Sequence, residues 1–150
     1  MRPYFLLALV VLGLSACSDD DPIGGPGVHP DIRGSFVGPY QETGVSAGGS
    51  SDFQCDMRID VVEQFEDAFI ADVFFLESRD CAEEVLWVTS SGTIDLDGQV
   101  VLDWDFSDLC SVFTGDTELV GALVGDVLSL TAAFECDGWS FADTYTGDRG

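Results

Sequence analysis

The sequence contains no lysine, and its single histidine is His29. Without lysine the chain cannot carry out Schiff-base catalysis or build a lysine-containing phosphate-binding loop. His29 lies in a segment rich in proline and glycine, so the rest of the chain cannot assemble a Ser-His-Asp or Cys-His site without it. These absences favour a protein that is not an enzyme.

A long hydrophobic run is also missing. The longest apolar stretch, residues 5–14, would span roughly 15 Å as a helix, about half the thickness of a bilayer core, so it is too short for a transmembrane anchor. It follows Arg2, and a positive charge before a short apolar core is typical of a signal peptide. The sequence therefore predicts a signal peptide over residues 1–16.

Residues 14–17, Leu-Ser-Ala-Cys, resemble a bacterial lipobox. The resemblance implies cleavage between Ala16 and Cys17 and attachment of diacylglycerol and fatty acid, such as palmitate, to Cys17. That lipid would hold the mature protein to a membrane. Ser18 after the cysteine resembles an outer-membrane sorting signal, which favours the outer over the inner membrane, and the acidic run 19–21 resembles some surface-export signals. We therefore expect an envelope lipoprotein facing the periplasm or the surface.

Residues 17–30 join the lipidated cysteine to the rest of the chain. Three prolines and three glycines leave no apolar period in this segment, which predicts a flexible acidic tether. The remaining chain, residues 31–150, is long enough for one domain with a hydrophobic core.

The net charge is strongly negative. Five arginines stand against 28 acidic residues, a formal charge of −23, and loss of Arg2 with the signal peptide makes it −24. Such a surface repels nucleic acid and anionic headgroups. It resembles the solvated surfaces of proteins from salt-loving bacteria, and binding of cations or of a basic partner is the functional alternative. Composition does not decide between the two.

The abundant carboxylates offer two kinds of site. Paired carboxylates can hydrolyse glycosides, although chance proximity is expected at this acidic content. Asp103, Asp105 and Asp108 have calcium-like spacing, but the segment lacks the glycine and terminal glutamate of an EF-hand. We expect Asp103 and Asp105 to be solvated on one face of a strand, and we expect no metal site and no cofactor.

The cysteines other than Cys17 number four, and none forms a Cys-x-x-Cys pair, so a zinc site is disfavoured. An even set in an exported chain predicts two disulfides. Local pairing, Cys55 with Cys81 and Cys110 with Cys136, spans 26 positions in each case and is favoured over the two other pairings.

Proline is absent after Pro39, as hydrogen-bonded strands require. From Phe53 to Val61 apolar and polar residues alternate without a break, which indicates a strand with one buried face. The sequence predicts eight strands, over residues 33–40, 52–62, 68–76, 84–96, 100–106, 118–124, 127–136 and 139–146.

The lengths of two hairpin loops can be inferred, because the loop length decides whether the apolar residues of the two flanking strands lie on the same face of the sheet. A two-residue turn at Gly125 and Asp126 puts the apolar residues of both flanking strands on one face. Around Gly98 a two-residue loop would mix the faces, so we expect a three-residue loop over residues 97–99 with Leu96 opposite Val100.

The expected fold is all-β, an eight-stranded antiparallel up-and-down meander that forms a barrel or a strongly curled sheet, because closure removes exposed strand edges. A two-layer β-sandwich is the alternative architecture.

Three segments, residues 34–36, 61–64 and 121–130, resemble lipocalin-like small bacterial lipoproteins. The resemblance implies a barrel whose mouth or interior binds a small apolar molecule. Phe36 stands where that family's Gly-x-Trp motif has tryptophan, and Arg149 is similar to its late arginine. Among the tryptophans, Trp104 falls on the inward face with Phe106, whereas Trp87 is out of phase with its neighbours. Phe36, Trp87 and Trp104 are the candidate pocket residues.

The functional hypothesis is a membrane-anchored module that binds a small apolar ligand or a cation. A non-catalytic envelope interaction or structural protein is the alternative, and a carboxylate-based hydrolase is a distant third. The oligomeric state is not indicated by the sequence.

The lipobox yields a direct prediction. Mass spectrometry of the mature N-terminus is expected to find Cys17 as the first residue, carrying diacylglycerol. An unmodified Cys17, or cleavage at another position, would contradict the lipoprotein assignment.

Overall fold

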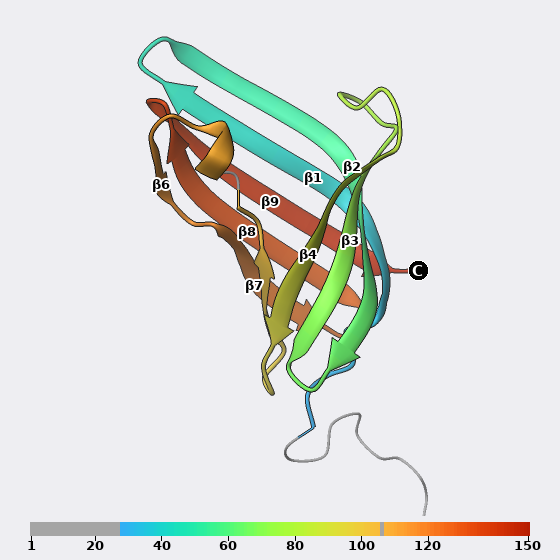
Figure 1. Cartoon of the computed structure of the whole chain (residues 1–150). Coiled ribbons are helices and arrows are strands. Elements are labelled where there is room, and N and C mark those ends of the chain that lie inside the picture. The colour runs from blue at the N-terminus through green and yellow to red at the C-terminus, as the bar shows by residue number, and fades with distance from the viewer. Residues whose placement is uncertain (1–27, 106) are drawn as a thin grey trace, which may run out of the picture.

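The computed structural model describes residues 28–105 and 107–150. The predicted signal peptide, Cys17 and the tether up to residue 27 lie outside the described residues. Within them the chain forms the strands β1 (Gly34–Ser46), β2 (Gly49–Phe65), β3 (Ala68–Leu76), β4 (Val85–Ile94), β5 (Gln99–Asp103), β6 (Phe113–Gly115), β7 (Glu118–Val124), β8 (Val127–Cys136) and β9 (Trp139–Arg149), with one short 3-10 helix, η1 (Ser107–Leu109) (Figure 1). None of the described residues belongs to a helix long and apolar enough to cross a membrane.

The strands close into an eight-stranded antiparallel barrel, which confirms the predicted fold. Sequence neighbours pair from β1 to β5, β5 pairs with β7, and β7 with β8. The last strand, β9, pairs with β8 on one side and with β1 on the other, so the sheet has no free edge across this seam. The short strand β6 pairs with the end of β8 beyond the reach of β7. A two-layer sandwich is therefore not the architecture.

Alternating side chains fill the interior of the barrel. On β2 the inward residues Cys55, Met57, Ile59 and Val61 are all buried, as the sequence pattern predicts. The other strands contribute apolar side chains of the same kind, and twelve large side chains have less than 2% of their surface exposed. Burial of this apolar surface is the main stabilising contribution to the fold.

The turn between β7 and β8 confirms the sequence prediction. Val124 pairs with Val127, which leaves Gly125 and Asp126 as the loop. Gly125 has a φ of 60°, the conformation that the first position of such a turn requires.

The loop between β4 and β5 has three residues, as predicted, but is shifted by one position. Ile94 pairs with Val100, and Asp95 N–H donates to the carbonyl of Gln99, so the loop is residues 96–98. The predicted pairing of Leu96 with Val100 is wrong, and Leu96 is 54% exposed. Asp95 explains the shift, because its carboxylate accepts hydrogen bonds from the backbone N–H groups of Asp97 and Gln99.

Several element boundaries also differ from the sequence prediction. β4 is shorter at both ends than the predicted segment 84–96, and β9 runs to Arg149 rather than to residue 146. The hairpin of β1 and β2 extends beyond the predicted strands, with exposed side chains that leave no clear apolar alternation. Strand β5 ends at Asp103 rather than at residue 106, and β6 was not predicted because three residues carry too short a pattern.

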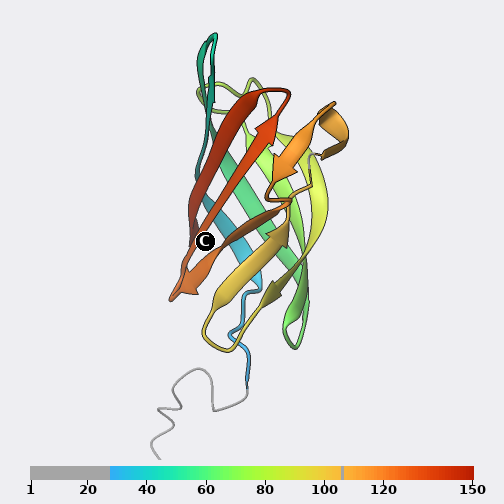
Figure 2. The same ribbon diagram turned by 90° about the vertical axis from the view of Figure 1, so that its left-hand side faces the viewer.

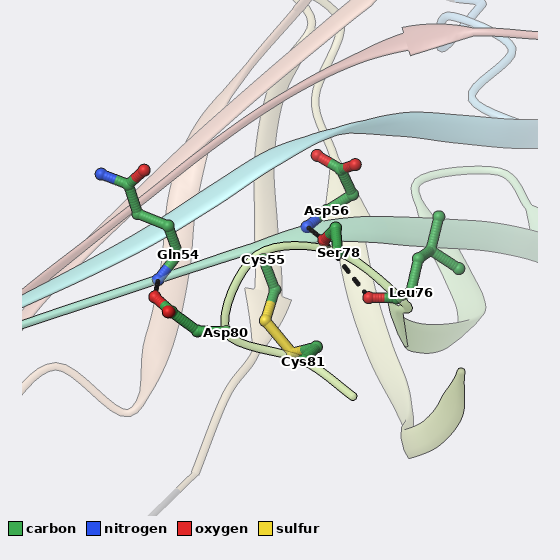
Figure 3. Close-up of a disulfide and its surroundings, with 7 residues drawn as sticks. All are labelled: Gln54, Cys55, Asp56, Leu76, Ser78, Asp80 and Cys81. Atoms are coloured by element: carbon green, nitrogen blue, oxygen red, sulfur yellow. Dashed lines mark hydrogen bonds between the residues drawn. A yellow bond between two sulfur atoms is a disulfide. The ribbon is translucent and has the colours of Figure 1, made fainter. Parts of the chain in front are cut away.

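The two disulfides have the predicted local pairing, Cys55 with Cys81 and Cys110 with Cys136. Figure 3 shows how the first one holds the β3–β4 loop against β2, beyond the point where β3 ends. There the Asp80 carboxylate accepts the N–H of Gln54, and the Ser78 hydroxyl accepts the N–H of Asp56. The loop thus replaces a missing strand as the hydrogen-bonding partner of β2.

The N-terminal segment covers one end of the barrel, at the bottom of Figure 2. Ile32 is fully buried there, Gln64 donates to the carbonyl of Pro30, and His29 Nδ1 donates to the carbonyl of Ile94 at 2.8 Å. The tether was predicted to stay flexible up to residue 30, but residues 29 and 30 are bonded to the barrel. We call this end, with the β2–β3, β4–β5 and β7–β8 turns, the closed end.

Replacing Cys55 and Cys81 together by alanine is expected to lower the free energy of unfolding by about 3.5 kcal/mol, because the open loop gains entropy in the unfolded chain. The same replacement of Cys110 and Cys136 should cost a similar amount, since both loops span 26 positions. Urea unfolding measures both. A nonreducing peptide map linking Cys55 to Cys110 or Cys136 would contradict the pairing.

Candidate functional site

The end of the barrel opposite the N-terminal segment carries the candidate site. We call this end the mouth. It is formed by the β1–β2 hairpin, the β3–β4 loop, the segment containing η1 and β6, and the β8–β9 turn (Figures 1 and 2). Both disulfides lie here and hold the loops in place.

A pocket opens at the mouth where β4 and β5 separate. These strands pair over residues 92–94 and 100–102, and beyond that pairing the Ser90 hydroxyl donates to the carbonyl of Asp103. The resulting pocket, which we call the β4–β5 pocket, has a volume of about 250 Å³. It is lined by Trp87, Val88, Ser90, Asp103, Trp104, Asp105, Asp108 and Leu109.

A β-bulge places Trp87 in this pocket. Val73 pairs with Val88 and Phe74 with Leu86, so Trp87 is the additional residue on β4. Bulges redirect side chains in this way next to functional sites. The Trp87 ring packs edge-on against Phe75, with ring centroids 5.5 Å apart, yet 46% of the residue is exposed.

Trp104 connects the pocket to the barrel interior. It is only 3% exposed, and its indole Nε1 donates to Asp143 Oδ2 at 3.2 Å. Its ring also lies 6.2 Å from that of Tyr40, which in turn contacts Phe53 and Phe75. The tryptophan that lines the pocket is therefore fixed from behind by a carboxyl group and an aromatic cluster.

Asp143 is a fully buried carboxyl group with an unusual environment. Its exposed fraction is 0%, and its Oδ1 atom has no hydrogen-bond partner among the described residues. Glu42 lies directly opposite on β1, facing the same interior. Burial raises the pKa of Asp143, opposed by the Tyr40 and Trp104 donors, and burial together with the charge of Asp143 raises the pKa of Glu42. Both carboxyl groups are therefore more easily protonated than usual.

The candidate residues from the sequence are only partly brought together. Trp87 and Trp104 line the same pocket, whereas Phe36 is fully buried near the closed end, under the guanidinium of Arg149 at 5.1 Å. Phe106 lies outside the described residues, and His29 lies at the closed end. Phe36 is therefore not a residue of this pocket.

The aspartates with calcium-like spacing lie on the pocket's rim. Asp103 and Asp105 are exposed, as predicted, but Asp105 lies beyond the end of β5 rather than on a strand. Its carboxylate accepts the N–H of Ser107 at the start of η1. Across the residues the structure describes, no three potential ligand side chains are grouped closely enough to hold a metal ion.

Sequence reasoning missed Asp143 and Glu42. The signal was present, since Asp143 is in phase with the inward residues Phe141 and Tyr145 of β9. An aspartate in phase with buried aromatics is the pattern that could have identified it.

Asp143 generates a pH prediction. Because its pKa is raised above the ordinary 3.8, its neutral form adds stability that is complete below that pH and is lost as the pH rises through the folded-state pKa. Asp143→Asn keeps an oxygen acceptor for Trp104 but cannot ionise. We expect the unfolding free energy of D143N, relative to wild type, to increase as the pH is raised above 3.8, measured by urea unfolding.

Asp148→Asn, which removes an exposed carboxylate from the same strand, is the matched control for the loss of one charge. A difference between D143N and wild type that stays constant with pH would refute the role of burial.

Comparison with known proteins adds no assignment. No protein-family model, curated protein or solved structure matches this chain. Its function must therefore be argued from its own residues and geometry.

Proposed function

We propose that this chain is a lipid-anchored envelope protein whose lipocalin-like barrel binds a small apolar ligand or a cation in the β4–β5 pocket. The observation that carries the proposal is the pocket itself, which places two tryptophans beside acidic groups at the mouth of a barrel otherwise filled by its own side chains. Apolar walls with a few placed polar groups are what small-molecule sites have in common.

The proposed anchoring is consistent with the orientation of the barrel. The described chain begins at the closed end, so a lipid on Cys17 would leave the mouth facing away from the membrane. Two disulfides favour an extracytoplasmic location. The sorting residue Ser18 favours the outer membrane.

The lipocalin-like assignment has further support at the closed end. Phe36, which stands in place of the family's tryptophan, lies under the guanidinium of Arg149, the late arginine of the resemblance. The two positions named by the sequence resemblance are therefore in contact.

Hydrolysis is disfavoured by the burial of Asp143. Glu42, which is half-buried, and Asp143, which is fully buried, form a carboxyl pair that faces the interior. A group with no exposed surface cannot act on a glycosidic bond. We therefore propose a binding role rather than catalysis. An envelope interaction protein without a ligand is the alternative that the following experiment tests.

Trp139→Phe leaves Trp87 and Trp104 as the only tryptophans, and both line the pocket. We expect at least one member of a panel of lipids, small apolar compounds and calcium to shift the tryptophan emission of W139F. The same compound should raise the free energy of unfolding by about 2.7 kcal/mol at a concentration of 100 times its Kd, which thermal unfolding detects as a higher midpoint temperature.

The matched control is Trp87→Leu in the wild-type background, which keeps an apolar wall but should weaken the shift. If no compound of the panel changes the tryptophan emission or the stability, the proposal of a ligand-binding protein is contradicted and an envelope interaction protein is favoured.

A further inference from the structure

We propose that the β4–β5 pocket recognises a small organic cation, an ammonium group carrying an apolar body, rather than a neutral molecule or a metal ion. This inference rests on the proposed function and specifies the class of ligand. It depends on the charge of the pocket, on its apolar walls and on the hydrogen bonds that its polar groups make.

The pocket has a negative charge that no arginine compensates. Three aspartates, Asp103, Asp105 and Asp108, line it. The four arginines of the described residues are engaged elsewhere: Arg33 with Asp31, Arg58 with Asp60 and Glu84, Arg79 with Gln54, and Arg149 with Asp126. The potential in the pocket therefore favours a cation.

The apolar walls distinguish an organic cation from a metal ion. Trp87, Trp104, Val88 and Leu109 form much of the lining, whereas calcium requires six to eight oxygen ligands. No metal-binding cluster occurs among the described residues, as noted for the rim. Tryptophan is the best aromatic partner for an ammonium group, and carboxylates nearby add to the attraction.

Two donors beside the pocket are already used within the protein. The Ser90 hydroxyl already donates to Asp103, and the Trp104 indole N–H donates to Asp143. The carboxylates can only accept when ionised. The bond to Asp143 also fixes the plane of the Trp104 ring, so Asp143 is a positioning residue in this site.

The volume limits the ligand. A pocket of about 250 Å³ lies below the range of roughly 300–1,000 Å³ that accommodates drug-sized molecules. The expected ligand is therefore a compact amine or quaternary ammonium compound rather than a long-chain lipid.

Calorimetric titration of the full mature protein with choline, with its neutral isostere 3,3-dimethylbutan-1-ol and with calcium chloride tests this inference. The two organic probes have the same shape and differ by one charge. We expect choline to bind about tenfold more tightly than the isostere, because the cation–π and carboxylate attractions act only on the cation. Choline binding should also weaken as salt is added, whereas binding of the isostere should not.

Two variants locate the effect. Trp87→Leu should reduce choline affinity about fivefold and leave that of the isostere nearly unchanged. Asp103→Asn should reduce choline affinity about threefold, as expected for an exposed charge. Asp148→Asn, which removes a charge from β9 outside the pocket, is the matched control and should leave choline binding unchanged.

The outcomes separate the two proposals. Equal binding of choline and its isostere, or binding of calcium without choline, would overturn the organic-cation inference while leaving a ligand-binding pocket. No binding of these probes, combined with no response to the wider panel, would overturn both.

Discussion

Closure of the sheet through β9 is the constraint on which the rest of the structure depends. This strand pairs with β8 along its whole length and with β1 from Val45 to Phe36, and it turns an open meander into a barrel. Closure gives every strand one face toward the solvent and one face toward the barrel interior. It also removes the exposed edges that would otherwise invite pairing between chains. Because Asp143 belongs to β9 and points inward, the same closure withdraws its carboxyl group from water.

The mouth is where this closure is least complete, and that is why the pocket occurs there. β4 and β5 share only three residue pairs, fewer than any other neighbouring strands of the eight-stranded barrel. Beyond them the wall is completed by the bulged Trp87, by the inward-turned Trp104 and by the segment containing η1. The Cys110–Cys136 disulfide joins that segment to the end of β8, so a covalent bond fixes the rim of the pocket in addition to the pairing of β6 with β8.

Much of the fold could be predicted from the sequence because alternation reports directly on a barrel wall. The bounds of β3, β7 and β8 agree with the predicted segments, since each has a buried face and a defined turn. Prediction failed where local hydrogen bonds compete with the pattern. The hydrogen bonds of the Asp95 carboxylate place the β4–β5 loop one residue earlier than predicted. The only sign of the bulge at Trp87 in the sequence is that this tryptophan is out of phase with the apolar alternation of its strand.

The candidate site was harder to predict because it depends on position rather than composition. With 28 acidic residues in the chain, no single carboxylate is conspicuous, and solvation accounts for those that face water. A solvated aspartate needs no partner, and an aspartate beside an arginine already has one. Asp143 is neither, since it is fully buried, has the Trp104 indole and the Tyr40 hydroxyl as its donors and lies opposite a second carboxyl group. A buried carboxyl group whose hydrogen bonds are incomplete lowers the stability of the fold. Unlike the exposed carboxylates, it does not contribute to solvation of the surface. Its contact with Trp104 links that cost to the geometry of the pocket, which is the physical reason to look for function there.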